Sequence, residues 1–291
     1  MMVREESSIL RLGLPKGRMQ IGVLSLLDEA GIDVVMGSRS YRPVVKMNGV
    51  EAKMLKPQNI VEMLHAGSRD IGFAGADWVA ELDVDLVELL DTGLDPVKLV
   101  AAAPEELLVN GQLPKGPLVV ASEYERLTTR WINETGMDAE FRHSYGATEV
   151  FPPEDADCIV DNTATGSTLV ANGLKIVDEL MKSSTRLYVN PRVLENTEKR
   201  EIVERFVLLL GSVLEARQRV MLEVNVDAEN LEAIVAILPC MREPTIATLH
   251  GGAGYAVKAA VPRSTLTEVI PALKARGGSD IVVTGLTQII P

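Results

Sequence analysis

The sequence is poor in the features that mark secreted, membrane-embedded and nucleic-acid-binding proteins. It has only two cysteines in 291 residues, Cys158 and Cys240, so it cannot contain a disulfide framework. No apolar run is long enough to cross a bilayer, and the charged start MMVREESS is unlike a signal peptide. The net charge of −12 argues against nucleic acid or an anionic membrane as a partner. We therefore expect a cytoplasmic protein that binds small molecules.

Aromatic residues make up only 4% of the chain, so Leu, Val, Ile and Ala must fill the core. The balance of 46% hydrophobic and 24% charged residues is that of an ordinary folded protein. The sequence contains no HExxH pattern for a zinc site and no GxSxG pattern for a serine nucleophile. Zinc-dependent and serine-dependent hydrolysis are therefore disfavoured.

The acidic excess is confined to the first part of the chain. The last 75 residues carry seven basic and seven acidic residues, so the whole net charge of −12 falls within residues 1–216. Such a change in charge predicts a domain boundary near residue 217, with domains at 1–216 and 217–291. Residues 201–216 have apolar side chains at helical spacing and are expected to form a connecting helix.

Short apolar runs alternate with helical patterns through the first 190 residues. This alternation predicts an α/β fold with mainly parallel strands, which bind ligands at their carboxyl ends, and the number of strands indicates two lobes with a cleft. DLVELLD and VKLVAAA (residues 85–91 and 97–103) are expected to be separate strands. Residues 217–291 instead show the order βαββαβ, which is typical of a ferredoxin-like domain.

The stretch IVDNTATGSTL, residues 159–169, carries the strongest chemical signal. An apolar strand ends in Asp161, small hydroxyl residues surround Gly166, and a helix is expected from about Ser167. Backbone N–H groups at such a turn, with hydroxyl donors beside them, favour a phosphate. The lysine of a Walker loop is missing. Because phosphate and carboxylate repel each other, Asp161 is expected to hold a ribose hydroxyl or a metal.

A second stretch, LPKGRM, also follows a predicted strand. It places Lys16 and Arg18 on either side of Gly17, where the strand gives way to a helix. Two cations at a helix start suit a polyphosphate ligand, because both can neutralise phosphate oxygens.

A third stretch, FAGADWVAE, lies at another strand end. Gly75 allows the backbone to approach a ligand closely. Asp77 fits a helix cap and a ligand contact equally well, so the residues alone leave its role open.

In this order, the segments LGLPKGRM, DIGFAGADWVAE and DCIVDNTATGSTLVANGL resemble the ATP phosphoribosyltransferases of histidine biosynthesis. The resemblance covers essentially the whole chain, and LPCMREPTIATL is similar to the regulatory domain of long-form members. It implies a two-lobed catalytic part, like a periplasmic binding protein, followed by the ferredoxin-like domain. The implied reaction uses Mg²⁺ and transfers the 5-phosphoribosyl group of phosphoribosyl pyrophosphate to N1 of ATP, releasing pyrophosphate.

The resemblance also implies roles for individual residues. The catalytic residues would be Asp161, Lys16 and Arg18, and Glu149 would help to order the metal. The donor loop would consist of Asp161, Asn162, Thr163, Ala164, Thr165, Gly166, Ser167 and Thr168. ATP would be bound by Lys16, Gly17, Arg18, Gly75, Asp77 and Arg39, with Arg42 as the alternative to Arg39. The commoner family pattern of the loop is DLVSTGTTL, so Asn162 and Ala164 depart from it.

Long-form members are inhibited by L-histidine, which binds between the C-terminal domains of a hexamer. The resemblance therefore implies a homo-oligomer, from dimer to hexamer, and a regulatory site at Thr245, Glu223 and His250. Two different classes of protein remain as alternatives: a small-molecule binding protein with the same two-lobed fold, and a catalytically silent regulatory subunit. The LPKGR stretch disfavours the first, and the retention of Asp161 and Gly166 disfavours the second.

Overall fold

The computed structural model describes residues 8–37 and 41–291, and the chain forms two compact units. The first unit comprises the residues up to Asp28 and Ile32–Arg205, and the second comprises Glu29–Gly31 and Phe206–Pro291. Helix α6, Thr197–Gln218, contains the position at which the first unit gives way to the second. Within the described ranges, no helix is long and apolar enough to span a membrane.

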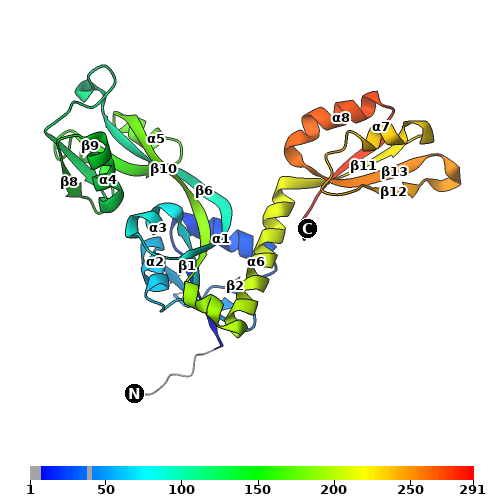
Figure 1. Cartoon of the computed structure of the whole chain (residues 1–291), viewed down its shortest axis with the longest axis horizontal. Helices are drawn as coiled ribbons and strands as arrows, with labels where there is room; N and C mark the ends of the chain where they lie inside the picture. Colours follow the sequence, from blue (N-terminus) through cyan, green and yellow to red (C-terminus); the bar gives the residue numbers. More distant parts are fainter. Residues whose placement is uncertain (1–7, 38–40) are drawn as a thin grey trace. The chain divides into compact units, whose positions relative to one another are not determined.

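The main sheet of the first unit has eight strands. They are β1 (Leu10–Pro15), β4 (Val50–Leu55), β5 (Ile71–Gly75), β6 (Val87–Pro104), β7 (Leu118–Ser122), β8 (Ala139–His143), β9 (Cys158–Thr163) and β10 (Leu174–Val189). Their order in the sheet is β4-β1-β5-β10-β6-β9-β7-β8. The first three strands are parallel and define the first lobe, and the last three are parallel and define the second lobe (Figure 1). The two-lobed α/β fold is thus confirmed.

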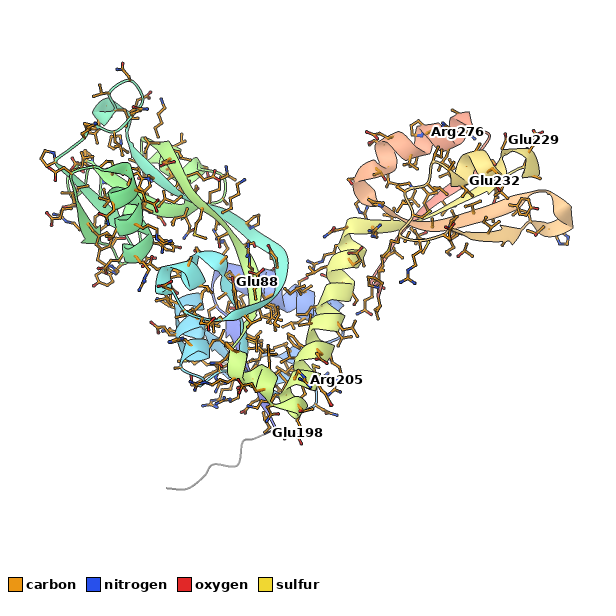
Figure 2. The ribbon with its side chains drawn as sticks, in the orientation of Figure 1. Glu88, Glu198, Arg205, Glu229, Glu232 and Arg276 are labelled. Carbon is orange, nitrogen blue, oxygen red and sulfur yellow. The ribbon has the colours of Figure 1, made fainter. Side chains whose placement is uncertain are left out.

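Two long antiparallel strands, β6 and β10, join the lobes. They pair with each other along nearly their whole length, while β10 also pairs with β5 of the first lobe and β6 with β9 of the second. The expectation of a mainly parallel sheet was wrong at this centre, and residues 85–91 and 97–103 contribute to one strand. Several bulges bend the pair, and Arg186 of β10 braces it by donating to Glu88 of β6 at 2.6 Å. Glu88 is labelled in Figure 2.

A helix follows each parallel strand, except β8, so the helix starts lie beside the carboxyl ends of the strands. These helices are α1 (Arg18–Glu29), α2 (Pro57–His65), α3 (Ala76–Leu82), α4 (Glu125–Thr135) and α5 (Ser167–Ala171). α1 buries Met19, Val23, Leu26 and Leu27, a spacing that places all four on one helical face. The shorter elements of this unit are β2 (Val34–Val35), β3 (Val44–Val45), and the 3₁₀ turns η1 (Glu105–Leu107), η2 (Thr148–Val150) and η3 (Pro191–Glu195).

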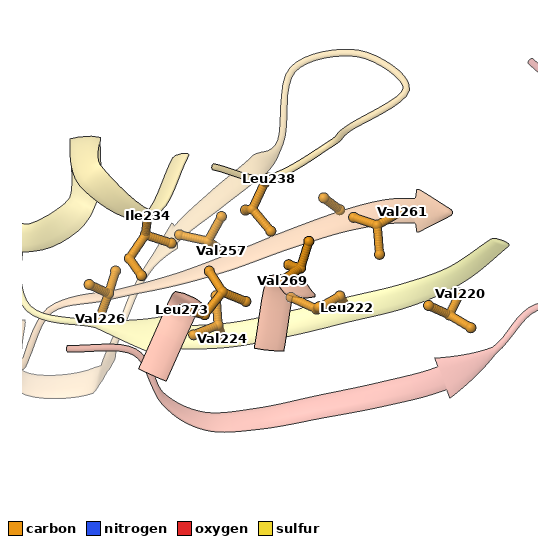
Figure 3. Packing of buried hydrophobic residues seen from close by; sticks show 11 residues of the cluster. Val220, Leu222, Val224, Val226, Ile234, Leu238, Val257, Val261, Val269 and Leu273 are labelled. Atoms are coloured by element: carbon orange, nitrogen blue, oxygen red, sulfur yellow. The ribbon is translucent and has the colours of Figure 1, made fainter. Parts of the chain in front are cut away.

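The second unit has a separate antiparallel sheet, in the order β12-β13-β11-β14. Its elements are β11 (Arg219–Val226), η4 (Ala228–Asn230), α7 (Leu231–Val235), β12 (Thr245–Thr248), η5 (His250–Gly252), β13 (Tyr255–Pro262), η6 (Arg263–Thr265), α8 (Leu266–Ala275) and β14 (Ser279–Gly285). Alternate residues of β11, from Val220 to Val226, pack with Ile234 of α7 and Leu273 of α8 (Figure 3). This order and packing confirm the predicted ferredoxin-like domain.

A buried carboxylate fastens the first turn of α6 to the sheet of the first lobe. Asp70, which immediately precedes β5, is 1% exposed and accepts hydrogen bonds from Arg11 Nη2 and Nε at 2.7 and 3.0 Å. Nζ of Lys199, a residue that is 8% exposed, lies 3.2 Å from the same carboxylate. Burial raises the pKa of Asp70, but the hydrogen bonds from Arg11 and the charge of Lys199 outweigh it and hold that pKa below its ordinary value.

Replacing Asp70 by Ala should lower the free energy of unfolding by about 3–5 kcal/mol, because Lys199 is left as an uncompensated buried charge. The lowered folded pKa means that the unfolded state binds the proton more tightly, so the stabilisation is complete above the ordinary Asp pKa and is lost as pH falls through the folded pKa. Urea unfolding at pH 7 measures the effect. The control is Asp33→Ala, which breaks the exposed pair with Lys46 and should cost less than about 1 kcal/mol. Equal losses in the two variants would contradict the prediction.

Candidate active site

A small polar cavity lies where the helix start after β1 faces the loop after β9. Its volume is about 250 Å³. It is lined by Arg18, Glu149, Asp161, Asn162, Thr163, Ala164, Thr165, Ser167, Thr168 and Leu169. Arg18 comes from the first lobe and the other residues come from the second lobe. Two stretches that the sequence analysis singled out, LPKGRM and IVDNTATGSTL, therefore meet in one cavity.

The loop after β9 holds its shape through its own hydroxyl groups. Gly166 adopts a φ of 79° immediately before α5, a conformation that favours glycine, and its N–H donates to Thr163 Oγ1 at 2.9 Å. The hydroxyl oxygens of Thr165 and Ser167 lie 2.9 Å apart. α5 is only five residues long, so its dipole is weak, and the donors for an anion are mainly the hydroxyl and amide groups of the loop.

The two cations of LPKGRM lie in different surroundings. Arg18 begins α1, is exposed and lines the cavity. Lys16 is half-buried, and its Nζ lies 3.3 Å from the centroid of the Tyr41 ring, a cation–π contact. Gly17 between them has a φ of 77°, which turns the chain from β1 into α1. Arg18 therefore faces the loop that follows β9, whereas Lys16 contacts the ring of Tyr41.

Two carboxylates, Asp161 and Glu149, line the same cavity. Burial raises the pKa of Asp161 to about 6; a hydrogen bond from the Asn162 N–H opposes the rise, and the nearby charges of Glu149 and Glu123 add to it. Negative charge is thus concentrated here, and within residues 8–37 and 41–291 no side-chain cation donates a hydrogen bond to Asp161. Such an arrangement favours a ligand that brings a cation or hydroxyl donors to this carboxylate.

Gly75 and Asp77 do not line this cavity. The Asp77 side chain is 5% exposed, and its two oxygens accept hydrogen bonds from Ser183 and Tyr124, each at 2.7 Å. A Cβ on Gly75 would lie 2.1 Å from Asp77 Oδ1, so this glycine makes room for the carboxylate. Both oxygens of the Asp77 carboxylate therefore have partners within the protein, whereas the family resemblance implies that Asp77 contacts ATP.

Sequence reasoning missed Tyr124 and Ser183. Tyr124 is 0% exposed, follows β7, and receives a hydrogen bond from Asn162 Nδ2 at 2.9 Å. The signal that could have found it is its position, because a polar side chain directly after a parallel strand lies at the same sheet edge as the loop after β9. Arg39 lies outside the described residues, and Arg42 is exposed in the segment before β3.

The predicted regulatory residues lie in the second unit, which contains a cavity of about 300 Å³. Thr245 lines this cavity together with Met221, Arg242, Glu243 and Lys258. Glu223 Oε1 lies 2.7 Å from Lys258 Nζ, so it is adjacent to the lining. His250, in η5, is exposed and does not line the cavity.

Comparison with known proteins shows which enzymes this chain resembles throughout its length. A family model described as ATP phosphoribosyltransferase (HisG) matches residues 56–210, and a model of the HisG C-terminal domain matches residues 216–288. The chain belongs to the ATP phosphoribosyltransferase family. The ATP phosphoribosyltransferase of Pelotomaculum thermopropionicum is 37% identical over 287 residues, which cover 97% of this chain and 99% of the relative. The ATP phosphoribosyltransferase of Chlorobium phaeobacteroides is 34% identical over 288 residues, which cover 97% of this chain and 98% of the relative.

A solved structure also matches part of the chain. It is an ATP phosphoribosyltransferase (HisG:HisZ) complex from Thermotoga maritima, with a TM-score of 0.63 and 29% identity, covering 71% of this chain and 99% of that chain. The remainder of this chain has no counterpart there, whereas the relatives from P. thermopropionicum and C. phaeobacteroides extend over nearly all of it. An ATP phosphoribosyltransferase joins the phosphoribosyl group to ATP in the first step of histidine biosynthesis. This chain is thus a pentosyl-transferring glycosyltransferase.

Asp161→Asn should stabilise the ligand-free ATP phosphoribosyltransferase while removing most of its activity. Because the folded pKa of about 6 exceeds the ordinary 3.8, the folded protein binds more protons than the unfolded chain between these values, and stability falls as pH rises through that window. At pH 8 the variant should gain about 1–3 kcal/mol, and near pH 4 the gain should vanish. Thermal unfolding at both pH values tests this, with the exposed Asp85→Asn as control. A variant less stable than the wild type at pH 8 would contradict it.

Proposed function

We propose that the cavity beside Arg18 binds phosphoribosyl pyrophosphate, with its 5-phosphate in the loop formed by residues 161–168. The observation that carries this proposal is the convergence of the Arg18 guanidinium and a hydroxyl-rich loop on one cavity. Thr165, Ser167 and Thr168 are exposed there, so their hydroxyl groups can turn toward an anion. Arg18 neutralises part of the phosphate charge from the opposite lobe.

The reaction requires positioning more than a strong base. N1 of adenine carries its own lone pair, which attacks the anomeric carbon as pyrophosphate departs, through a transition state that resembles an oxocarbenium ion. Asp161 faces the ribose hydroxyl groups and supplies negative charge beside the developing positive charge. Lys16 can follow the departing polyphosphate only by leaving the ring of Tyr41, because the ammonium rests there in the free protein.

Enzymes of this family depend on a metal ion, and we propose Mg²⁺. Among the described residues no group of three or more His, Cys, Asp or Glu side chains could hold a metal. Glu149 and Asp161 still fit Mg²⁺, which often takes one or two carboxylates and completes its coordination with water and substrate phosphates. Bound there, the ion would neutralise pyrophosphate oxygens and relieve the repulsion from Glu149, which adds to the effect of burial on the pKa of Asp161.

For ATP we propose the neighbouring end of β1, where Lys16, Gly17 and Arg18 offer cations and an exposed backbone. Gly75 and Asp77 would shape this edge through their packing rather than touch the nucleotide. Of the two alternatives Arg39 and Arg42, Arg42 lies among the described residues, and we propose it for a further phosphate contact.

The second unit is proposed to bind L-histidine as an inhibitor, in an oligomer ranging from dimer to hexamer. Its cavity suits an amino acid, because Arg242 and Lys258 can pair with a carboxylate while Glu243 can accept from an ammonium. Thr245 adds a hydroxyl at the same surface. The face of the sheet that carries Met221 and Glu223 is not covered by α7 or α8, which leaves it open to a second copy.

The first test is an assay with ATP, phosphoribosyl pyrophosphate and Mg²⁺, which follows the absorbance of phosphoribosyl-ATP. Arg18→Ala should lower kcat/KM for phosphoribosyl pyrophosphate by about 10- to 100-fold, as expected for one charge-assisted contact. Arg200→Ala, on the exposed side of α6, is the matched control and should be unchanged. Full activity of the Arg18 variant would exclude the proposed site, and an inactive wild type would favour a silent subunit or a binding protein.

Thr245→Val should weaken inhibition by L-histidine about tenfold or more at unchanged basal activity, because a cavity-lining hydroxyl is lost. Thr284→Val is the control, since Thr284 lies on the same face of the sheet but does not line the cavity. An enzyme that L-histidine does not inhibit would remove the regulatory part of the proposal and leave the catalytic part intact.

A further inference from the structure

A chain of buried hydrogen bonds links the donor loop of the second lobe to the first lobe. Asn162 Nδ2 donates to the Tyr124 hydroxyl at 2.9 Å, and this hydroxyl donates to Asp77 Oδ2 at 2.7 Å. The other oxygen of Asp77 accepts from Ser183 Oγ at 2.7 Å, while the Asp77 N–H donates back to Ser183 Oγ at 3.1 Å. The chain thus joins β9, the residue before α4, the start of α3, and β10.

The Tyr124 side chain, at the centre of this chain, has little freedom to move. It is 0% exposed, and its ring is stacked on that of Trp78 from α3, with 4.6 Å between the ring centroids. Burial, followed by the charge of Asp77, raises the pKa of Tyr124 well above its ordinary value, so the hydroxyl keeps its proton and remains a donor to Asp77. The Tyr124 oxygen is therefore a fixed acceptor for the Asn162 amide.

The backbone beside Tyr124 is also fixed from both lobes. Glu81 of α3 accepts from the N–H groups of Arg126 and Leu127 in the first turn of α4, at 2.9 and 3.0 Å. Ser122 Oγ accepts from the Tyr124 N–H at 2.9 Å and donates to the carbonyl of Val160 in β9 at 2.6 Å. The tyrosine is consequently held by α3 of the first lobe and by the strand that carries the donor loop.

Asn162 transmits this fixed position to the residues that face the substrate. Its backbone N–H donates to Asp161 Oδ1 at 2.7 Å, so the orientation of Asn162 affects the carboxylate of Asp161. Its side-chain amide already has a partner in Tyr124. An apolar side chain at this position could not make the hydrogen bond.

We propose that Tyr124 is a positioning residue of the donor site, which orients Asp161 and the phosphate loop through its hydrogen bond to Asn162. The inference rests on the proposed binding of phosphoribosyl pyrophosphate by this loop. Tyr124 does not contact the substrate; it determines the side-chain position of Asn162 and hence the geometry that Asp161 offers to the ribose. Loss of the tyrosine hydroxyl should therefore weaken binding of the phosphoribosyl donor more than binding of ATP.

The test is a double-mutant cycle with Tyr124→Phe, Asn162→Leu and the double variant. Tyr124→Phe keeps the stacked ring and removes only the hydroxyl. We expect it to raise KM for phosphoribosyl pyrophosphate about tenfold, the effect of one buried hydrogen bond, while KM for ATP changes less than about twofold. If Tyr124 acts through Asn162, the double variant should show no larger rise than Asn162→Leu alone. Tyr188→Phe, which removes a hydroxyl from another mostly buried tyrosine of the same unit, should leave both KM values unchanged.

The possible outcomes separate this inference from a general structural role and from the proposed function. Multiplicative effects of the two substitutions, or equal rises in both KM values, would overturn the inference, because Tyr124 would then act independently of Asn162 or on the lobes as a whole. A donor KM that Tyr124→Phe leaves unchanged would also overturn it. An inactive wild type would instead contradict the proposed function. If Tyr124→Phe fails to fold, the KM values of the double variant are compared with those of Asn162→Leu alone. The double variant is expected to fold, since replacing both partners by apolar groups can be nearly neutral for stability.

Discussion

The antiparallel pairing of β6 with β10 is the constraint on which the active site depends. The proposed phosphate loop, residues 161–168, follows β9, which is hydrogen-bonded to β6. Arg18 follows β1, which is hydrogen-bonded to β5, itself the neighbour of β10. The sheet positions of the loop and of Arg18, which line the same cavity, are therefore linked through this pair of strands. Side chains reinforce the pair where its regular register fails: Thr92 Oγ1 donates to the carbonyl of Thr185 at 2.6 Å, and Thr185 Oγ1 donates to Asp95 at 3.1 Å. A buried hydroxyl in such a bulge is stable only when it has a partner, so these contacts offset the lost ladder bonds.

Electrostatics at the cavity oppose the stability of the fold. Asp161 is held near Glu149 with its pKa raised to about 6, whereas Asp70, in the same unit, is held by Arg11 and Lys199 with its pKa lowered. Asp70 has cationic partners and stabilises the protein, whereas Asp161 is buried with no cation hydrogen-bonded to it among the described residues, so its ionised form is destabilising. Strain of this kind is expected where binding energy has to be used for chemistry.

The sequence alone predicts those elements that depend on residues close together in the chain. Residues 161–168 are predicted as a phosphate loop because a glycine among hydroxyl residues follows an apolar strand, and the ferredoxin-like domain was found because its elements follow the order βαββαβ. The central strands were misjudged because Gly93 and Pro96 interrupt residues 85–103, and only the pairing with β10 makes these residues one strand. Tyr124 was missed because its partners, Asp77 and Asn162, lie 47 and 38 residues away, so no local pattern identifies it.

Asn162 shows how a local departure can be explained by a distant partner. By sequence, an amide in place of an apolar residue at the end of a buried strand would cost stability, since a buried polar group without a partner is unfavourable. In the structure the amide donates to Tyr124, which in turn donates to Asp77, so each group in the chain is satisfied. Removing the Tyr124 hydroxyl takes one partner from Asn162 and one from Asp77, so this group ties the loop and α3 together energetically. The same contact that makes Asn162 acceptable inside the protein thereby couples the phosphate loop to the opposite lobe.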